Sequence, residues 1–263
     1  MTDPVHRFDD SVGYERFMGR WSRAAGGVFL DWLAPGDGAR WLDVGCGTGA
    51  FTELVVRTCA PATVDAVDPA AAQIDHALGR PVAAHAGFQV ADARALPFAD
   101  GTFDIVASAL ALNFIPDIAA GLREMRRVAR AGGQVAGYVW DFPAERSPSW
   151  PIRQGMRRIG LDPAPVPGTA ASGLVPLVGA FRAAGFERVS TTVIDVGESY
   201  ADFADFWDAQ TPGFSPTTAI IAALAPADRA RLVDAVRAIV PTRPDGRVAY
   251  SARANGIQAL VPD

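Results

Sequence analysis

The stretch Trp41-Leu42-Asp43-Val44-Gly45-Cys46-Gly47-Thr48-Gly49-Ala50 joins a short apolar run to a cluster of three glycines. Glycine lets the backbone turn tightly and approach a ligand, and the helix expected from residue 50 points its N-terminus at that ligand. The spacing Gly45-x-Gly47-x-x-Ala50 also satisfies the dinucleotide fingerprint, and Asp68 stands near the distance expected of a ribose-binding acid. The loop therefore predicts a nucleotide-like cofactor and leaves its identity open.

Apolar runs alternate with helical spacings on both sides of this loop. Strands are expected over 40–44, 63–67, 88–90, 103–109 and 134–140, and helices over 50–60, 70–78 and 117–129. This alternation favours a mostly parallel sheet with right-handed crossovers. The rhythm breaks over 142–172, where the Pro-rich run 162–168 can only be loop. Beyond it we expect helices over 174–184, 200–209, 217–224 and 226–240, and strands over 188–196 and 247–254 that pair antiparallel at the sheet edge.

Three acidic residues follow expected strands, at the edge where open α/β sheets bind ligands. Asp43 lies two residues before the first glycine, where it would repel a pyrophosphate but attract the ammonium of an amino-acid cofactor. It therefore favours S-adenosylmethionine over NAD. Asp68 is placed to accept the ribose hydroxyls, and Asp92 with the Ala93 backbone to read the adenine edge. An ordinary turn or helix cap explains each acid nearly as well.

At this point residues 40–140 resemble the class I methyltransferases of the ubiquinone/menaquinone-biosynthesis-like, type 11 group. The matching segments, in the expected order, are Leu42-Asp43-Val44-Gly45-Cys46-Gly47-Thr48-Gly49, Val67-Asp68-Pro69, Asp92-Ala93, Leu96-Pro97-Phe98-Ala99-Asp100-Gly101-Thr102-Phe103-Asp104 and Glu124-Met125-Arg126-Arg127-Val128. The segment 14–22 is similar to an N-terminal segment that folds over the cofactor in some members. Beyond residue 141 the resemblance fades.

The resemblance implies a Rossmann-like, doubly wound α/β fold with a seven-stranded, mostly parallel sheet, an antiparallel last strand and helical lid insertions. It implies one domain over 1–263, with a cofactor-covering segment at 1–30, a cofactor-binding core at 40–141 and substrate lids at 142–172 and 198–240. S-adenosylmethionine is the implied cofactor. Its implied contacts are Tyr14, Arg20, Asp43, Gly45, Gly47, Thr48, Gly49, Asp68, Pro69, Asp92, Ala93 and Ser108.

The sequence says less about which residues bind the methyl acceptor. Asn113 and Phe114 follow the fourth expected strand, and Trp140 with Asp141 ends the fifth, so all four are placed to face the transferred methyl group. Large aromatic side chains at such positions are also typical of a core. Phe203 and Trp207, together with Phe206, have helical spacing and predict either the packing face of a lid helix or a wall of the substrate pocket.

A dedicated base is needed only for an acceptor such as a phenol or an acidic carbon, and histidine is then the usual residue. Of the three histidines, His6 lies in the segment expected to close over the site and is the best candidate. His76 falls within an expected helix and His85 in a loop. All three are more typical of exposed or structural positions. Two cysteines and three scattered histidines give no spacing typical of a metal site.

Charge and composition restrict the partners and the cellular location to be expected. A net charge of −5 and a pI near 5.2 disfavour binding to nucleic acid. The dense cationic run Arg123, Arg126, Arg127 and Arg130 is typical of a solvated last helical turn. No stretch approaches the ~20 apolar residues of a membrane helix, and Cys46 and Cys59 form no disulfide framework, so we expect a cytoplasmic protein that acts on a small molecule. The oligomeric state is not predicted.

Three functions stay open. The leading one is an S-adenosylmethionine-dependent methyltransferase that modifies an O, N or C atom of a small molecule. An NAD(P)-dependent oxidoreductase is suggested by the glycine spacing, but Asp43 and the absence of any lysine, and hence of a Tyr-x-x-x-Lys pair, disfavour it. The third is a protein of the same fold that binds the cofactor without turnover.

Overall fold

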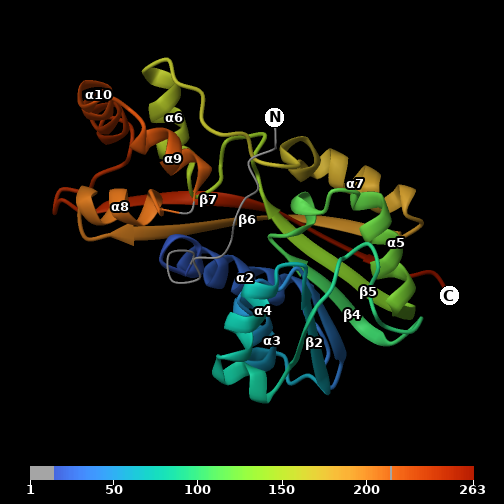
Figure 1. Ribbon diagram of the computed structural model, residues 1–263. Helices are drawn as coiled ribbons and strands as arrows, with labels where there is room; N and C mark the ends of the chain where they lie inside the picture. The colour runs from blue at the N-terminus through green and yellow to red at the C-terminus, as the bar shows by residue number, and fades with distance from the viewer. Residues whose placement is uncertain (1–14, 214) are drawn as a thin grey trace.

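The computed structural model describes residues 15–213 and 215–263 and places them around one seven-stranded sheet of order β3-β2-β1-β4-β5-β7-β6 (Figure 1). The strands are β1 (Arg40–Val44), β2 (Thr63–Asp68), β3 (Gly87–Val90), β4 (Phe103–Ala109), β5 (Ala129–Trp140), β6 (Glu187–Tyr200) and β7 (Val248–Leu260). The pairs from β3 to β5 are parallel, whereas β7 runs antiparallel to both β5 and β6. The predicted Rossmann-like α/β fold with an antiparallel last strand is confirmed.

Helices cover both faces of the sheet. They are α2 (Arg20–Leu33), α3 (Ala50–Thr58), α4 (Ala71–Leu78), α5 (Ile118–Val128), α6 (Trp150–Arg158), α7 (Leu174–Ala183), α8 (Phe203–Gln210), α9 (Pro216–Ala222) and α10 (Pro226–Arg237). Short turns of other helix types span η1 (Glu15–Gly19), η2 (Pro81–Ala84), η3 (Leu112–Phe114) and η4 (Thr169–Ser172). None of the helices described has the length and apolar character that a bilayer crossing requires.

Two large apolar clusters hold helices to the two faces of the sheet, and a third, small one of Cys46, Ala66 and Ile74 lies between the glycine loop, β2 and α4. On one face, Phe29 of α2 and Phe51 of α3 pack on Tyr138 of β5, with ring centroids 4.7 and 6.0 Å from the tyrosine ring. On the other face, Leu122 of α5 and Phe181 of α7 lie in a second cluster with β1, β4 and β5. Side chains alternate along each strand, so both faces of the central strands are apolar, as buried parallel strands require.

A separate group of helices, α6, α8, α9 and α10, gathers at one end of the molecule around the extended ends of β6 and β7 (Figure 1). Helix α6 packs on α10 at Gly155, where a Cβ atom would lie 2.2 Å from the Val236 side chain. The sequence pattern predicted neither α6 nor the buried helix α2. Helix α6 interrupts its apolar face with glycine and arginine, and α2 lies before the first strand, where only a covering segment was expected.

Candidate functional site

The glycine loop after β1 turns in the conformations that the sequence predicted. Gly45, Gly47 and Gly49 have φ values of 78°, 53° and 79°, in the left-handed region that favours glycine. A Cβ atom at Gly45 would lie 2.4 Å from the Cβ of Ala111, so this position is closed to other residues by contact as well. Gly49 directly precedes α3, and the loop amides therefore stand at a helix N-terminus that favours negative or polar ligand atoms.

Asp43 lies beneath this loop with 2% of its surface exposed. Its Oδ2 atom accepts a hydrogen bond of 2.7 Å from the Thr52 hydroxyl of α3. Its Oδ1 atom is buried and has no hydrogen-bond partner among the described residues. Burial raises the pKa of Asp43 to about 7, and nearby Asp68 adds to the rise while the Thr52 hydrogen bond opposes it. A buried carboxylate with a free oxygen fits the ammonium group of an amino-acid cofactor.

Asp68 closes the loop from β2. Its Oδ2 atom accepts the Gly47 amide and its Oδ1 atom accepts the Ala70 amide, both at 2.9 Å. Burial raises the pKa of Asp68 against these two hydrogen bonds. The turn-stabilising role considered from the sequence is thus present. Each carboxylate oxygen keeps a second lone pair, so the same side chain retains capacity for ribose hydroxyls. Pro69, next to it, is exposed.

Asp92 lies after β3 and is tied to its own loop. Arg94 donates to its carboxylate from Nε and from a terminal nitrogen, the latter at 2.6 Å. These hydrogen bonds hold the pKa of Asp92 below its usual range. Ala93 between them is half-buried. A bound adenine would therefore meet the Ala93 backbone and a carboxylate that is already ion-paired.

Three of the other cofactor residues proposed from the resemblance, Arg20, Thr48 and Ser108, lie among the described residues, and Thr48 in the glycine loop is buried. Ser108 is fully buried, and its Oγ atom has no partner among the described residues. Arg20, the first residue of α2, forms an ion pair of 2.8 Å with Glu198 of β6 and donates to the Ser199 carbonyl. A cofactor carboxylate would compete with that ion pair for Arg20. Tyr14 and the candidate base His6 lie outside the described residues.

The residues expected on the substrate side differ in their burial and in their hydrogen-bond partners. Asn113 of η3 is buried and donates from Nδ2 to the Pro167 carbonyl at 3.0 Å, which anchors the Pro-rich segment to the strand ends. Phe114 is half-buried. Asp141 caps the turn after β5 by accepting the Ala144 amide at 3.3 Å. Trp140, the last residue of β5, is 3% exposed, and its indole nitrogen has no described partner.

Phe203 and Trp207 pack within the lid. Their rings stack at 6.0 Å, and the Arg237 guanidinium of α10 lies 4.2 Å from the centre of the Phe203 ring. Phe206, between them in sequence, is the fully buried residue of this helix. The packing face predicted for the lid helix is present, with Phe206 at its centre.

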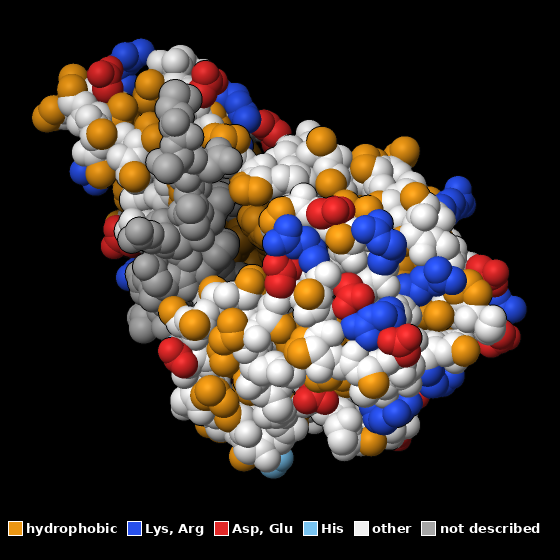
Figure 2. Space-filling view, turned by 45° about the vertical axis from the view of Figure 1, so that its right-hand side comes forward, with side chains coloured by type: hydrophobic (Ala, Val, Ile, Leu, Met, Phe, Trp, Pro, Cys, Tyr) orange, Lys and Arg blue, Asp and Glu red, His pale blue; other side chains and the backbone are white. Residues whose placement is uncertain are grey.

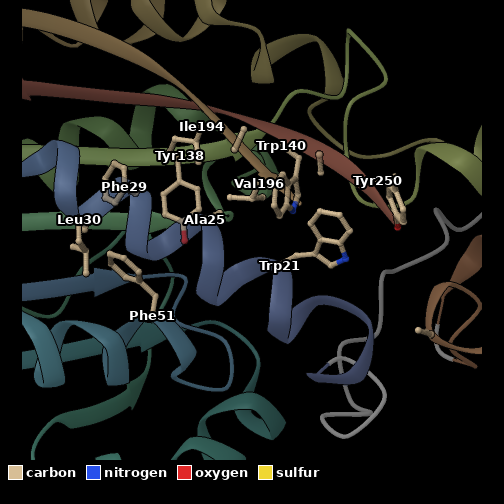
Figure 3. Packing of buried hydrophobic residues seen from close by; sticks show 14 of the residues in the cluster. Trp21, Ala25, Phe29, Leu30, Phe51, Tyr138, Trp140, Ile194, Val196 and Tyr250 are labelled. Carbon is tan, nitrogen blue, oxygen red and sulfur yellow. The ribbon is translucent and has the colours of Figure 1, made fainter. Parts of the chain in front are cut away.

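An aromatic network that the sequence interpretation missed lies next to Trp140. Trp21 of α2 packs edge-on against Trp140 at 6.5 Å and lies 5.0 Å from the Tyr250 ring (Figure 3). The Trp21 Nε1 atom donates to the Tyr200 hydroxyl at 3.1 Å, and Gln210 Nε2 donates to the same oxygen at 3.0 Å. The sequence does contain a signal for this network: an aromatic residue stands at the end of β5 (Trp140), at the end of β6 (Tyr200) and near the start of β7 (Tyr250).

Two of the three histidines, His76 and His85, lie among the described residues. His76 on α4 is half-buried and His85 is exposed. Within the described residues, no group of three or more His, Cys, Asp or Glu is placed to hold a metal ion. On the face that Figure 2 shows, acidic and basic side chains of the described residues are intermingled.

The arginine run on α5 is not the freely solvated turn that its pattern suggested. Arg127 forms ion pairs with Glu124 and Asp100 at 2.7 and 2.8 Å and donates to the backbone carbonyls of Leu96 and Phe98. These contacts tie α5 to the loop before β4. Arg127 therefore stabilises the fold, which corrects the interpretation from the sequence.

Comparison with known proteins identifies relatives of the cofactor half. Residues 42–137 match the model of the methyltransferase domain family of type 11. A ubiquinone/menaquinone biosynthesis C-methyltransferase of Geotalea uraniireducens is 35% identical over 140 residues, which are 51% of this chain and 56% of that protein. A malonyl-[acyl-carrier protein] O-methyltransferase of Erwinia pyrifoliae is 38% identical over 113 residues, 43% of this chain and 42% of that protein.

Among solved structures, the YcgJ protein of Bacillus subtilis superposes with a TM-score of 0.59 at 18% sequence identity and covers 91% of this chain and 98% of its own. This likeness supports the fold alone. The chain spans about half the length of the curated relatives that it matches.

Proposed function

Because residues 42–137 match the model of the type 11 methyltransferase domain, we propose that the protein binds S-adenosylmethionine and transfers its methyl group to a small molecule. The observation that carries this proposal is the Oδ1 atom of Asp43, which is buried and unpartnered beneath the glycine loop. A pyrophosphate beside that carboxylate would be repelled, whereas an ammonium group would satisfy it. The Asp43 side chain thus favours this cofactor over a dinucleotide.

In the proposed site, Asp43 binds the ammonium group, Asp68 the ribose hydroxyls, and Asp92 with the Ala93 amide the adenine edge. The loop residues Gly45, Gly47, Thr48 and Gly49 surround the methionine part, with Pro69 and Ser108 at its border. When bound, the cofactor supplies a sulfonium methyl group for in-line attack by the acceptor. The chain's contribution is to align the two and to exclude water.

We further propose that 40–141 is the cofactor-binding core and that 1–30 covers the cofactor, while 142–172 and 198–240 close over the acceptor. Support comes from Asn113, whose amide holds the first lid segment against the strand ends. Asn113, Phe114, Trp140 and Asp141 then line the acceptor side, whereas Phe203 and Trp207 shape the lid. A bacterial relative named for ubiquinone/menaquinone biosynthesis supports a small-molecule acceptor, and we propose that the protein acts in the cytoplasm, as its sequence led us to expect.

The test is calorimetric titration of the purified protein with S-adenosylmethionine, S-adenosylhomocysteine, NAD and NADP. We expect binding of the two adenosyl sulfur compounds near micromolar, which corresponds to about −8 kcal/mol, and no binding of the dinucleotides. Asp43→Asn should weaken that binding, and Arg123→Ala, at an exposed position on α5, serves as the matched control. Binding of NAD or NADP in place of the sulfur compounds would overturn the proposal.

A further inference from the structure

Arg80 lies in the turn after helix α4, and its side chain reaches the glycine loop. The Arg80 amide donates to the Ala77 carbonyl at 3.0 Å, and Pro81 follows directly. A residue that precedes proline is restricted to extended backbone, and Arg80 has φ −96° and ψ 154°. The end of α4 and the proline therefore fix the backbone from which this side chain extends.

The guanidinium group of Arg80 joins the glycine loop to helix α3. Its Nη1 atom donates to the Thr48 carbonyl at 2.7 Å, and its Nη2 atom forms an ion pair of 2.5 Å with Glu53 in the first turn of α3. The side chains of Arg80 and Glu53 are 20% and 32% exposed, so water screens these charge-assisted bonds only in part. Because Glu53 neutralises the guanidinium, the effect of Arg80 on a ligand passes through the loop peptide that it holds.

The peptide group between Thr48 and Gly49 is held on both sides. The C=O and N–H groups of a trans peptide point in opposite directions. Arg80 binds the Thr48 carbonyl, and the Gly49 amide donates to the Cys46 carbonyl at 2.9 Å. The Thr48 amide, on the preceding peptide, has no hydrogen-bond partner among the described residues, although Thr48 is only 3% exposed. This fixed loop therefore keeps one unused N–H donor.

The unused Thr48 amide suits the negative group of an amino-acid cofactor. It lies directly before α3, at the helix end that favours negative charge. In such a cofactor the carboxylate shares a carbon atom with the ammonium group, which is proposed to bind Asp43 beneath the same loop. A cofactor placed by Asp43 therefore brings its carboxylate to the loop, where a backbone donor is available.

We propose that Arg80 is a positioning residue for the cofactor carboxylate. By holding the peptide that follows Thr48, Arg80 keeps the Thr48 amide directed at that carboxylate, and it does so without touching the cofactor itself. Loss of the guanidinium releases the peptide and weakens binding of the carboxylate, whereas the Asp43–ammonium pair is unaffected. This inference rests on the proposed function, because it concerns the same cofactor site.

The test measures, by calorimetry, the affinity for S-adenosylhomocysteine and for its decarboxylated analogue, which keeps the adenosine and the ammonium group. Arg80→Met keeps the apolar stem of the side chain and removes the guanidinium. It should bind S-adenosylhomocysteine about tenfold more weakly than the wild type, as a hydrogen bond in the site is lost, and the analogue with wild-type affinity. Arg80→Lys should recover most of the loss, because its ammonium can still donate to the Thr48 carbonyl.

Two controls separate the loop from other causes. Arg80→Met leaves the Glu53 carboxylate without its partner, so the double variant Arg80→Met with Glu53→Gln is measured as well, and it should show the same tenfold loss. Arg40→Met is the matched control, because Arg40 forms an ion pair of 3.0 Å with Asp104 at the start of β1, the other end of the strand that leads into the loop. It should keep both affinities.

Wild-type binding of S-adenosylhomocysteine is measured first. Its absence refutes the proposed function and this inference with it, whereas binding that Arg80→Met leaves unchanged refutes only the role of Arg80. The role of Arg80 is also refuted by an equal loss for both ligands, by recovery in the double variant, by the same loss in Arg40→Met, or by Arg80→Lys binding no tighter than Arg80→Met. If Arg80→Met does not fold, the double variant, which leaves no unpaired carboxylate, decides in its place.

Discussion

Protonation of Asp43 should control cofactor affinity near neutral pH. In the ligand-free protein its pKa is raised to about 7 by burial, so at pH 6 most molecules carry a neutral carboxyl beneath the glycine loop. An ammonium group bound there favours the carboxylate. Affinity for S-adenosylhomocysteine should therefore increase as the pH rises through 7, and the bound state should hold the carboxyl ionised.

The magnitude follows from the two ionisations involved. About a tenth of Asp43 is ionised at pH 6 and about three quarters at pH 7.5, while a ligand amino group of pKa ~8 is still about three quarters protonated at pH 7.5. Multiplying the ionised fraction of Asp43 by the protonated fraction of the ligand amino group predicts about sixfold tighter binding at pH 7.5 than at pH 6. The effect of pH on the free energy of unfolding has the opposite sign. Because the folded pKa exceeds the unfolded one, Asp43 favours folding fully at acidic pH, and this contribution is lost as the pH rises through 7.

Calorimetry at pH 6.0, 6.5, 7.0 and 7.5 measures the effect. Asp43→Asn should bind S-adenosylhomocysteine at least about tenfold more weakly at pH 7.5, because it loses the charged partner, and its affinity should not change across this range. 5′-Methylthioadenosine, which lacks the amino-acid part, should show no pH dependence in either protein. A wild-type affinity that is flat with pH, or an equal slope in Asp43→Asn, would refute the assignment of this carboxylate to the ammonium group.

Three further outcomes are expected. Asp68→Ala removes the acceptor of two loop amides and should weaken S-adenosylhomocysteine binding at least about tenfold, whereas Arg123→Ala should not; equal losses by calorimetry would contradict the loop assignment. Arg127→Ala should lower the free energy of unfolding by about 2 kcal/mol, and wild-type stability in urea would show that its contacts are dispensable. Gly155→Ala places a Cβ atom 2.2 Å from a side chain of α10 and should speed hydrogen exchange in α6 and α10, while Gly179→Ala, with open space around it, should not.

The cofactor half could be predicted because its signals are local. Strand β1 occupies 40–44 and β4 occupies 103–109, as the apolar runs indicated, and Gly45 takes the positive φ that its place in the loop required. These features depend on neighbours within a few positions. Asp43 was assigned from the same reasoning, and its burial and unpartnered oxygen agree with that assignment.

Arg127 shows where pattern reasoning fails on the surface. Its spacing on α5 is that of a solvated arginine, yet two of its acceptors are backbone carbonyls, of Leu96 and Phe98, which no side-chain pattern reveals. The same limit applied to α6. Ser149 and Pro151 give it a helix start, but its buried face is defined by α10, which lies many residues further along the chain.

The acceptor side depends on contacts of still longer range. Trp21 and Tyr200 are 179 positions apart, and Tyr250 and Pro148 are 102 apart, so neither hydrogen bond leaves a periodic trace in the sequence. The family match ends at residue 137, before the lid helices α6 and α8–α10, before β6 and β7, and before Trp140, Tyr200, Gln210 and Tyr250. The family match therefore covers the cofactor loop and does not extend to the segments proposed to close over the acceptor. The groups that select the acceptor should therefore be sought among the buried polar atoms where the lid meets the strand ends.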